Sequence, residues 1–213
     1  MRIWRNVYTF APMIYINDDI SGFDFNAALP LLSEQRRLQA LSFKYELGRK
    51  TCAAAYLLLR EGLQKEYGIT EPPLFEYGEY GKPHLIGHPD IHFSLSHCKE
   101  AALCVISDRP VGADIESIRH YNESLARYTM NENEMNKILG SARPDVEFIR
   151  FWTQKEAVCK LSGKGISNKM TTVLKGTETF KTVVNVEQGY VYSVIYSCQS
   201  QDAHRHNSST NHR

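Results

Sequence analysis

The chain has 213 residues, of which 42% are hydrophobic and 23% are charged, a composition typical of a soluble globular protein. Its formal net charge of +1 excludes a protein that attracts nucleic acid through overall charge, so a phosphate site would have to be a local cluster of basic residues. No apolar run approaches the roughly 20 residues that span a bilayer, and we expect no secretory signal. The five cysteines form no C-x-x-C pair, which indicates a reduced, cytoplasmic chain without a zinc site.

The first half of the chain predicts two helices between strands. Alternating apolar residues and short buried runs predict the strands, and a segment rich in Ala and Leu predicts the longer helix. Pro72 and Pro73 end the helical region, and Gly78 and Gly81 mark a turn within 75–83. The expected strands cover 13–16, 91–95 and 101–107, and the expected helices cover about 33–41 and 43–67.

The second half predicts a strand, then helices, then further strands. The expected strands cover 111–115, 171–174, 179–186 and 190–196, and the expected helices cover about 123–128, 132–139 and 145–162. Residues from Gln199 onward are polar and low in complexity, which predicts disorder. We therefore expect an α+β protein with an N-terminal lobe over 1–110, a C-terminal lobe over 111–198 and a disordered tail over 199–213.

Two carboxylates lie close together on the strand expected at 111–115. Asp114 and Glu116 are two residues apart, so their side chains project from one face of an extended segment. Two such groups repel each other unless a cation lies between them, and Mg²⁺ prefers oxygen ligands. The alternative is two solvated charges on an edge strand.

The helix expected at 145–162 carries a second charged group. Trp152, Glu156 and Lys160 fall at i, i+4 and i+8 and form one stripe, whereas Lys155 points about 100° away from Glu156. A Glu–Lys pair at this spacing is also consistent with an ordinary surface ion pair. The following Gly163-Lys164-Gly165 could approach an anion closely or could simply end the helix.

Residues that can bind phosphate occur near turns in the first half. Lys82, Ser96, His97 and Arg49 supply ammonium, hydroxyl, imidazole and guanidinium groups from different segments. His97 ends an expected strand, where side chains often face a crevice. The alternative is a structural histidine.

Taken together, five motifs resemble the 4′-phosphopantetheinyl transferase superfamily, in its two-lobed surfactin-synthetase-activating (Sfp) type. They occur in the family's order across roughly residues 77–166. The motifs are Gly81-Lys-Pro83, Phe93-Ser-Leu-Ser-His97, Val111-Gly-Ala-Asp-Ile-Glu116, Phe151-Trp-Thr-Gln-Lys-Glu156 with Lys160, and Gly163-Lys-Gly165.

The resemblance implies two similar lobes related by a pseudo-twofold, each a small sheet packed on a long helix, with coenzyme A in the cleft between them. It implies three Mg²⁺ ligands, which are Asp114, Glu116 and Glu156. It also implies residues that bind the coenzyme, which are Arg49 at the 3′-phosphate, Lys82, Ser96, His97, Lys160 at the pyrophosphate, and Lys155. Glu134 matches a further acidic residue, and Arg36 and Arg37 alone represent the lysines that the family often places before its first long helix.

The implied activity is Mg²⁺-dependent transfer of 4′-phosphopantetheine from coenzyme A to a serine of an apo acyl or peptidyl carrier protein, with release of 3′,5′-ADP. Glu156, Lys160 and His97 are the expected catalytic residues, with Glu156 as candidate base. The alternatives are a non-catalytic protein that binds coenzyme A or a carrier, and a Mg²⁺-dependent phosphodiester hydrolase. We expect a monomer without nucleic-acid or membrane partners, and a carrier-docking patch at Arg119, Arg127, Tyr128 and Met130.

Overall fold

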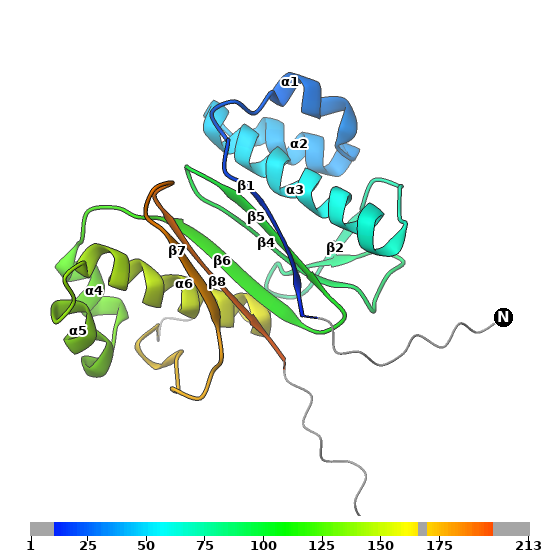
Figure 1. The fold of residues 1–213 in the computed structure, drawn as a ribbon. Coiled ribbons are helices and arrows are strands. Elements are labelled where there is room, and N and C mark those ends of the chain that lie inside the picture. The colour runs from blue at the N-terminus through cyan, green and yellow to red at the C-terminus, as the bar shows by residue number, and fades with distance from the viewer. Residues whose placement is uncertain (1–10, 166–169, 198–213) are drawn as a thin grey trace, which may run out of the picture.

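The computed structural model describes residues 11–165 and 170–197 (Figure 1). The tail predicted to be disordered over 199–213 lies outside the described residues. Helices and small antiparallel sheets alternate along the chain, as expected for an α+β protein. Within the described ranges, no helix is both long enough and apolar enough to cross a membrane.

The first sheet is antiparallel and packs on the long helix α3 (Glu46–Tyr67). Its strands are β1 (Met13–Asn17), β4 (His92–His97) and β5 (Ala102–Ser107), in the order β1-β5-β4. Tyr56 and Leu59 of α3 are fully buried, and Gly68 ends the helix in the left-handed conformation with φ of 69°. The shorter elements α1 (Phe25–Ala28), the 3₁₀ turn η1 (Leu29–Leu31), α2 (Glu34–Ser42) and the hairpin β2 (Phe75–Tyr77) and β3 (Pro83–Leu85) complete this part.

The second sheet is also antiparallel and packs on the helix α6 (Pro144–Ser162). Its strands are β6 (Val111–Ser117), β7 (Lys181–Asn185) and β8 (Tyr190–Tyr196), in the order β6-β8-β7. Helices α4 (Glu123–Thr129) and α5 (Glu132–Leu139) cover the outer end of α6 (Figure 1). The strand predicted over 171–174 is wrong, because Met170–Thr172 form the 3₁₀ turn η2 instead.

The two sheets share one order of connections. In each, a strand is followed by a long helix and then by a hairpin, and the last strand lies in the centre. The strands of one sheet all precede residue 110, and those of the other all follow it. The pseudo-twofold relation between the lobes stays a prediction.

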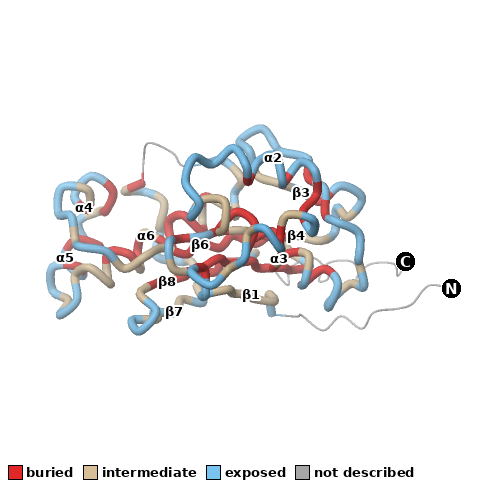
Figure 2. The backbone as a smooth tube through the Cα atoms, turned by 90° about the horizontal axis from the view of Figure 1, so that it is seen from above, coloured by how far each residue is buried: buried red, intermediate tan, exposed pale blue. Residues whose placement is uncertain are grey.

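Strand β5 joins the hydrophobic clusters of the two parts, because its side chains alternate between its two faces. Cys104 and Ile106 belong to the cluster around α3, whereas Leu103 and Val105 pack with Val111 and other residues of the second sheet. Figure 2 shows this buried centre in red, with exposed segments in pale blue around it. Strands β4 and β6 therefore lie next to each other at the middle of the molecule.

A glycine allows α6 to lie directly on β6. A Cβ atom at Gly112 would collide with the Ala157 carbonyl oxygen and the Leu161 nitrogen of the helix backbone. Only a residue without a side chain permits this approach. The contact fixes the carboxylates of β6 relative to the charged residues of α6.

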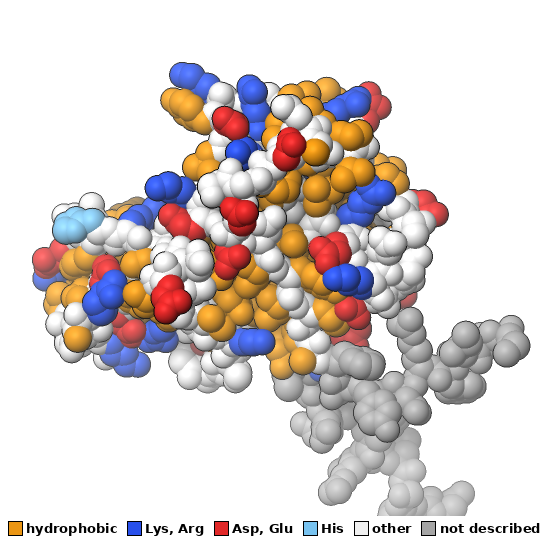
Figure 3. Space-filling model, turned by 45° about the horizontal axis from the view of Figure 1, so that its top comes forward, with side chains coloured by type: hydrophobic (Ala, Val, Ile, Leu, Met, Phe, Trp, Pro, Cys, Tyr) orange, Lys and Arg blue, Asp and Glu red, His pale blue; other side chains and the backbone are white. Residues whose placement is uncertain are grey.

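Exposed apolar side chains gather around α2. They lie over η1, α2 and the start of α3, where Figure 3 shows orange atoms beside blue ones along the upper part of the surface. The exposed large apolar residues of this region are Leu31, Leu38, Leu41, Phe43, Tyr45 and Leu47.

Candidate functional site

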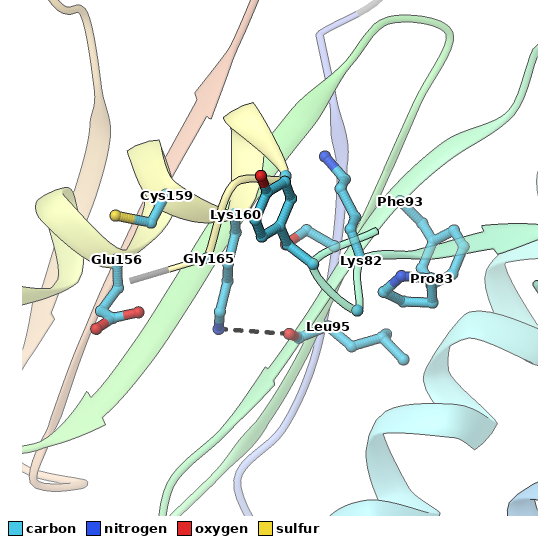
Figure 4. Close-up of a pocket in the computed structure, with 12 residues that line it drawn as sticks. Lys82, Pro83, Phe93, Leu95, Glu156, Cys159, Lys160 and Gly165 are labelled. Atoms are coloured by element: carbon cyan, nitrogen blue, oxygen red, sulfur yellow. Dashed lines mark hydrogen bonds between the residues drawn. The ribbon is translucent and has the colours of Figure 1, made fainter. Parts of the chain in front are cut away.

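A cavity of about 300 Å³ opens where β3, β4 and α6 meet (Figure 4). Lys82 and Phe93 form one side, and Glu156 and Lys160 project from α6 on the other. Gly163 and Gly165 of the loop after α6 also line it. Residues from 80–95 and from 156–165 thus line one hollow, which is a setting typical of a ligand site.

Lys160, Ser96 and Asp114 form a hydrogen-bonded cluster beside this cavity. Lys160 Nζ donates to Asp114 Oδ1 at 2.7 Å and to Ser96 Oγ at 2.8 Å. Ser96 Oγ also donates to Asp114 Oδ1 at 2.7 Å. Lys160 reaches the Leu95 carbonyl oxygen at 3.5 Å, the dashed line in Figure 4. The structure thereby brings together three residues that the sequence placed in separate motifs.

One oxygen of Asp114 lacks a hydrogen bond. Asp114 is 4% exposed, and its Oδ2 is buried without a partner. A buried acceptor of this kind is costly unless a donor or a cation satisfies it. The unpartnered Oδ2 is therefore an atom through which Asp114 could bind a cation.

The two neighbouring glutamates have perturbed acidities. Burial, followed by the charge of Asp114, raises the pKa of Glu156 to about 7, and Glu116 adds to the effect while Lys160 opposes it. Burial and Asp114 also raise the pKa of Glu116, and Arg119 and Trp152 oppose that shift. The three carboxylates are thus close enough to repel one another, which is the condition that a divalent cation relieves.

The three carboxylates are not arranged as a complete metal-binding site. Across residues 11–165 and 170–197, no three His, Cys, Asp or Glu side chains are placed so as to hold a metal ion. Their chemistry nevertheless fits Mg²⁺, because they are hard oxygen donors, two have raised pKa values, and Asp114 Oδ2 lacks a partner. The Mg²⁺ ligand set of Asp114, Glu116 and Glu156 remains a prediction.

Lys82 lies in the cavity wall, and its ammonium connects this wall to β6 and α6. Nζ donates to the Val111 carbonyl oxygen at 3.3 Å and to the Leu161 carbonyl oxygen at 3.1 Å. Burial lowers the pKa of Lys82. A ligand phosphate would have to compete with these two carbonyl groups.

His97 and Arg49, both expected at the coenzyme, occupy different settings. His97 ends β4, and burial of the imidazole, with the charges of Lys160 and Arg36, lowers its pKa. Arg49 lines a separate cavity of about 360 Å³ with Asp24 and other residues of α1 and α3. Its Nε donates to the Phe43 carbonyl oxygen at 2.9 Å. The structure therefore brings His97 near Lys160 and places Arg49 elsewhere.

Lys155 requires a correction. We expected it at the coenzyme, but its side chain is fully buried and Nζ binds Glu134 Oε2 at 2.8 Å and the Met170 carbonyl oxygen at 2.7 Å. The same Glu134 closes a capping box with Asn131 at the start of α5. Lys155 therefore holds α5 and η2 against α6 and does not line the cavity. The Asn131-x-x-Glu134 pattern in the sequence is the signal that identifies Glu134 as a capping residue of α5.

The expected carrier-docking patch is only partly on the surface. Tyr128 is 76% exposed and Arg127 pairs with Glu123 on the surface of α4. Met130, however, is 3% exposed and belongs to the core between α4, α5 and α6. Its predicted docking contact is wrong, because an apolar residue that ends a short amphipathic helix packs inward here.

Comparisons with known proteins agree with the motifs. The model of the 4′-phosphopantetheinyl transferase superfamily matches residues 110–207. A 4′-phosphopantetheinyl transferase of Bacillus subtilis is 27% identical over 159 residues, 72% of this chain and 70% of that protein. The transferase psf-1 of Bacillus pumilus is 31% identical over 65% of this chain and 60% of its own length. The Sfp transferase of Bacillus subtilis strain 168 is 25% identical over 72% of this chain and 70% of its own length.

Proposed function

Because the chain belongs to the 4′-phosphopantetheinyl transferase superfamily, in its Sfp type, we propose that it transfers the phosphopantetheine group of coenzyme A to a serine of an apo acyl or peptidyl carrier protein. One observation carries the proposal. The cluster of Lys160, Ser96 and Asp114 lies beside the raised-pKa carboxylate of Glu156, at the edge of a cavity between the lobes.

The proposal includes a magnesium ion held by Asp114, Glu116 and Glu156. When bound, Mg²⁺ supplies positive charge that neutralises the diphosphate of coenzyme A and the leaving group. The unpartnered Asp114 Oδ2 and the mutual repulsion of the three carboxylates support this ligand set.

In the proposed reaction the carrier serine Oγ attacks the β-phosphorus, to which the pantetheine is attached. The new bond is Oγ–P, and the broken bond joins this phosphorus to the bridging oxygen, so that 3′,5′-ADP leaves with the electron pair. Glu156 is the candidate base that takes the serine proton. The protein contributes positioning and charge stabilisation rather than covalent chemistry.

Lys160 is proposed to stabilise the charge that develops on the 5′-phosphate of the departing 3′,5′-ADP. Its hydrogen bond to the Leu95 carbonyl oxygen is the longest of its three, at 3.5 Å, compared with 2.7 and 2.8 Å to Asp114 and Ser96. A phosphate oxygen would replace the Leu95 contact with the least loss, because a charged acceptor binds an ammonium more strongly than a carbonyl does. Ser96 keeps the ammonium oriented.

Intact mass spectrometry tests the proposal directly. The protein is incubated with coenzyme A, MgCl₂ and a panel of apo acyl and peptidyl carrier proteins. We expect at least one carrier to gain the mass of one phosphopantetheine group, with one equivalent of 3′,5′-ADP. Binding of coenzyme A without modification of any carrier would favour a non-catalytic protein, and release of free phosphopantetheine without a carrier would favour a hydrolase.

We also propose that the protein acts as a cytoplasmic monomer. Two lobes of the same chain enclose the cavity, so a second copy is not needed to complete it. Sedimentation velocity at several protein concentrations should show one species of monomer mass. A stable trimer would contradict the proposal.

A further inference from the structure

Trp152 is a half-buried tryptophan that the proposed reaction does not use. It lies on α6, one turn before Glu156. Its indole N–H, which can only donate, makes a hydrogen bond to the carboxylate of Glu116. Donation to an ionised acceptor gives a stronger hydrogen bond than donation to a neutral one. Trp152 therefore contacts one of the three carboxylates that are proposed to bind Mg²⁺.

The packing of β6 on α6 brings these two residues together independently of that hydrogen bond. Lys82 binds the carbonyl oxygens of Val111 and Leu161, so the start of β6 lies at the last turn of α6. Measured from there, five residues of an extended strand span about 16 Å, which is about the length of eleven helical residues. Glu116 thus comes level with the turn of α6 that contains Trp152.

Aromatic rings hold the indole in place. Phe148 lies one turn before Trp152 on α6, and the centres of the two rings are 6.1 Å apart. Tyr121, from the segment after β6, meets the Phe148 ring edge-on at 6.2 Å. All three rings pack in the hydrophobic cluster around α4, α5 and α6. An aromatic side chain packed in this way has few orientations, so the core fixes the direction of the indole N–H.

Glu116 lacks the support that Asp114 receives. Asp114 accepts hydrogen bonds from Lys160 and Ser96. Glu116 is only half-buried, and it forms no ion pair within the part of the chain that the structure describes. A glutamate has one more rotatable bond than an aspartate, so holding it in one orientation requires a partner. Side chains that bind metals are commonly oriented by a second hydrogen bond, and the indole supplies one here.

We propose that Trp152 is a positioning residue, whose indole N–H orients the Glu116 carboxylate for Mg²⁺. The inference rests on the proposed function, in which Glu116 is one of the ligands of the ion. A carboxylate has about four acceptor positions, so one hydrogen bond leaves positions for a cation. Because the indole acts through Glu116, its loss should weaken Mg²⁺ binding and should leave the later chemical steps intact.

The test measures Mg²⁺ binding by a protein in which Trp152 is the only tryptophan. The chain has two tryptophans, so Trp4→Phe provides this parent protein, which should bind Mg²⁺ as the wild type does. Biosynthetic replacement of the remaining indole by benzothiophene keeps its size and shape but puts sulfur in place of the N–H. Isothermal titration with MgCl₂ should then show a dissociation constant about 10- to 100-fold higher than in the parent. The circular dichroism spectra of the two proteins should agree, because the aromatic packing is retained.

Two further measurements distinguish positioning from a merely structural role. In the parent protein, the indole ¹⁵N–¹H magnetic resonance signal of Trp152 should move when Glu116→Gln is introduced, even without metal. In transfer assays, the benzothiophene protein should need about 10- to 100-fold more MgCl₂ for its half-maximal rate and should recover kcat to within about threefold at saturation. A kcat that stays low at saturating MgCl₂ would contradict a positioning role.

The outcomes separate this inference from the proposed function. A parent that modifies carriers, with an Mg²⁺ dissociation constant that is unchanged when the N–H is removed, would overturn the inference alone. An indole signal that does not respond to Glu116→Gln would do the same. A parent that modifies no carrier would overturn the proposed function, while the titration with MgCl₂ would still decide the role of Trp152. Absence of Mg²⁺ binding, both with and without coenzyme A, would overturn both.

Discussion

At the scale of single residues, the central feature is a carboxylate that is expensive to ionise. Glu156 is 8% exposed, next to Asp114 and Glu116, and its pKa is raised to about 7. Such a group is poorly matched to a purely structural role, because folding holds it where its charged form is disfavoured. The lost solvation is offset when the site binds a cation.

Replacement of Glu156 should therefore abolish practical transfer. For Glu156→Gln we expect kcat to fall by about 10²–10³-fold or more, because a preorganised charge and the proposed base are both lost. The neutral amide fills the same volume, so the circular dichroism spectrum should remain close to wild type. Glu132→Gln, an exposed residue of α5, is the matched control and should keep full activity. Transfer at the wild-type rate by Glu156→Gln would refute its role.

The same residue predicts how stability depends on pH in metal-free protein. The folded-state pKa of Glu156, about 7, lies above the ordinary value of 4.5, so the folded state binds the proton more tightly than the unfolded state. Its contribution is complete below about pH 4.5 and is lost as pH rises through about 7, at a cost of about 3 kcal/mol or less. Urea unfolding in the presence of EDTA should show a smaller decline from pH 5.5 to pH 8 in Glu156→Gln than in wild type.

Magnesium gives the complementary measurement. Added MgCl₂ should raise the wild-type unfolding midpoint more at pH 8 than at pH 5.5, since the ligands must be ionised to bind the ion. Glu156→Gln should lose most of this increment. Identical pH profiles for the two proteins, with no response to MgCl₂, would contradict both the shifted pKa and the metal site.

At the scale of elements, the contact between β6 and α6 determines where the site residues lie. For Gly112→Ala we expect a loss of about 3 kcal/mol or more of unfolding free energy, because the new Cβ meets helix backbone that cannot rotate away. Gly78→Ala is the control, since its Cβ would lie 3.6 Å from the nearest atom and the residue does not have positive φ. Denaturant unfolding measures both variants. A wild-type midpoint for Gly112→Ala would show that the two elements are not held this close.

Many of the elements were predictable from the sequence, because their signals are local. The strand predicted over 190–196 coincides with β8, and the helix predicted over 145–162 differs from α6 by one residue. The strand predicted over 171–174 failed because its β-branched residues resemble a strand, while the chain there is held as η2 by the bond from Lys155 to the Met170 carbonyl group. That bond joins residues 15 positions apart and leaves no periodic signal.

The residues of the candidate site could be predicted from the motifs more readily than the bonds between their side chains. The motifs identified Ser96, Asp114 and Lys160, and the structure brings these three into one cluster. Lys155 precedes Glu156 directly, and helical geometry alone does not say which of the two faces the core. The buried pairing of Lys155 with Glu134 depends on how α5 packs against α6, which the sequence does not encode locally.

At the scale of the whole molecule, two sheets built on one plan of connections meet along β4 and β6. Their junction includes polar bonds as well as apolar packing. Ser94 Oγ of β4 accepts from the Ala113 N–H of β6 at 2.9 Å and donates to the Ala113 carbonyl oxygen at 3.3 Å. One side chain of the first sheet thus satisfies both backbone groups of Ala113 in the second sheet, and Asp114 follows Ala113 directly in sequence.

Loss of this hydroxyl should weaken the molecule as a unit. Ser94→Ala leaves two buried backbone groups without partners, so we expect a loss of about 1–3 kcal/mol of unfolding free energy with an unchanged m-value. Ser42→Ala, which removes an exposed hydroxyl bonded within its own helix, should have little effect. Two separate transitions in Ser94→Ala would mean that the two sheets, each with its helices, unfold independently. An unchanged midpoint would mean that the bond contributes nothing.

Lys82 has a further consequence for ligand entry. Its ammonium ties the β2–β3 hairpin to the first residue of β6 and to the last turn of α6, with two neutral carbonyl groups as its partners. A multiply charged anionic ligand that binds this ammonium replaces its hydrogen bonds to those carbonyl groups. The same three N–H groups of Lys82 therefore serve both ligand binding and the attachment of the hairpin to β6 and α6. A tightly bound ligand leaves the hairpin less firmly attached.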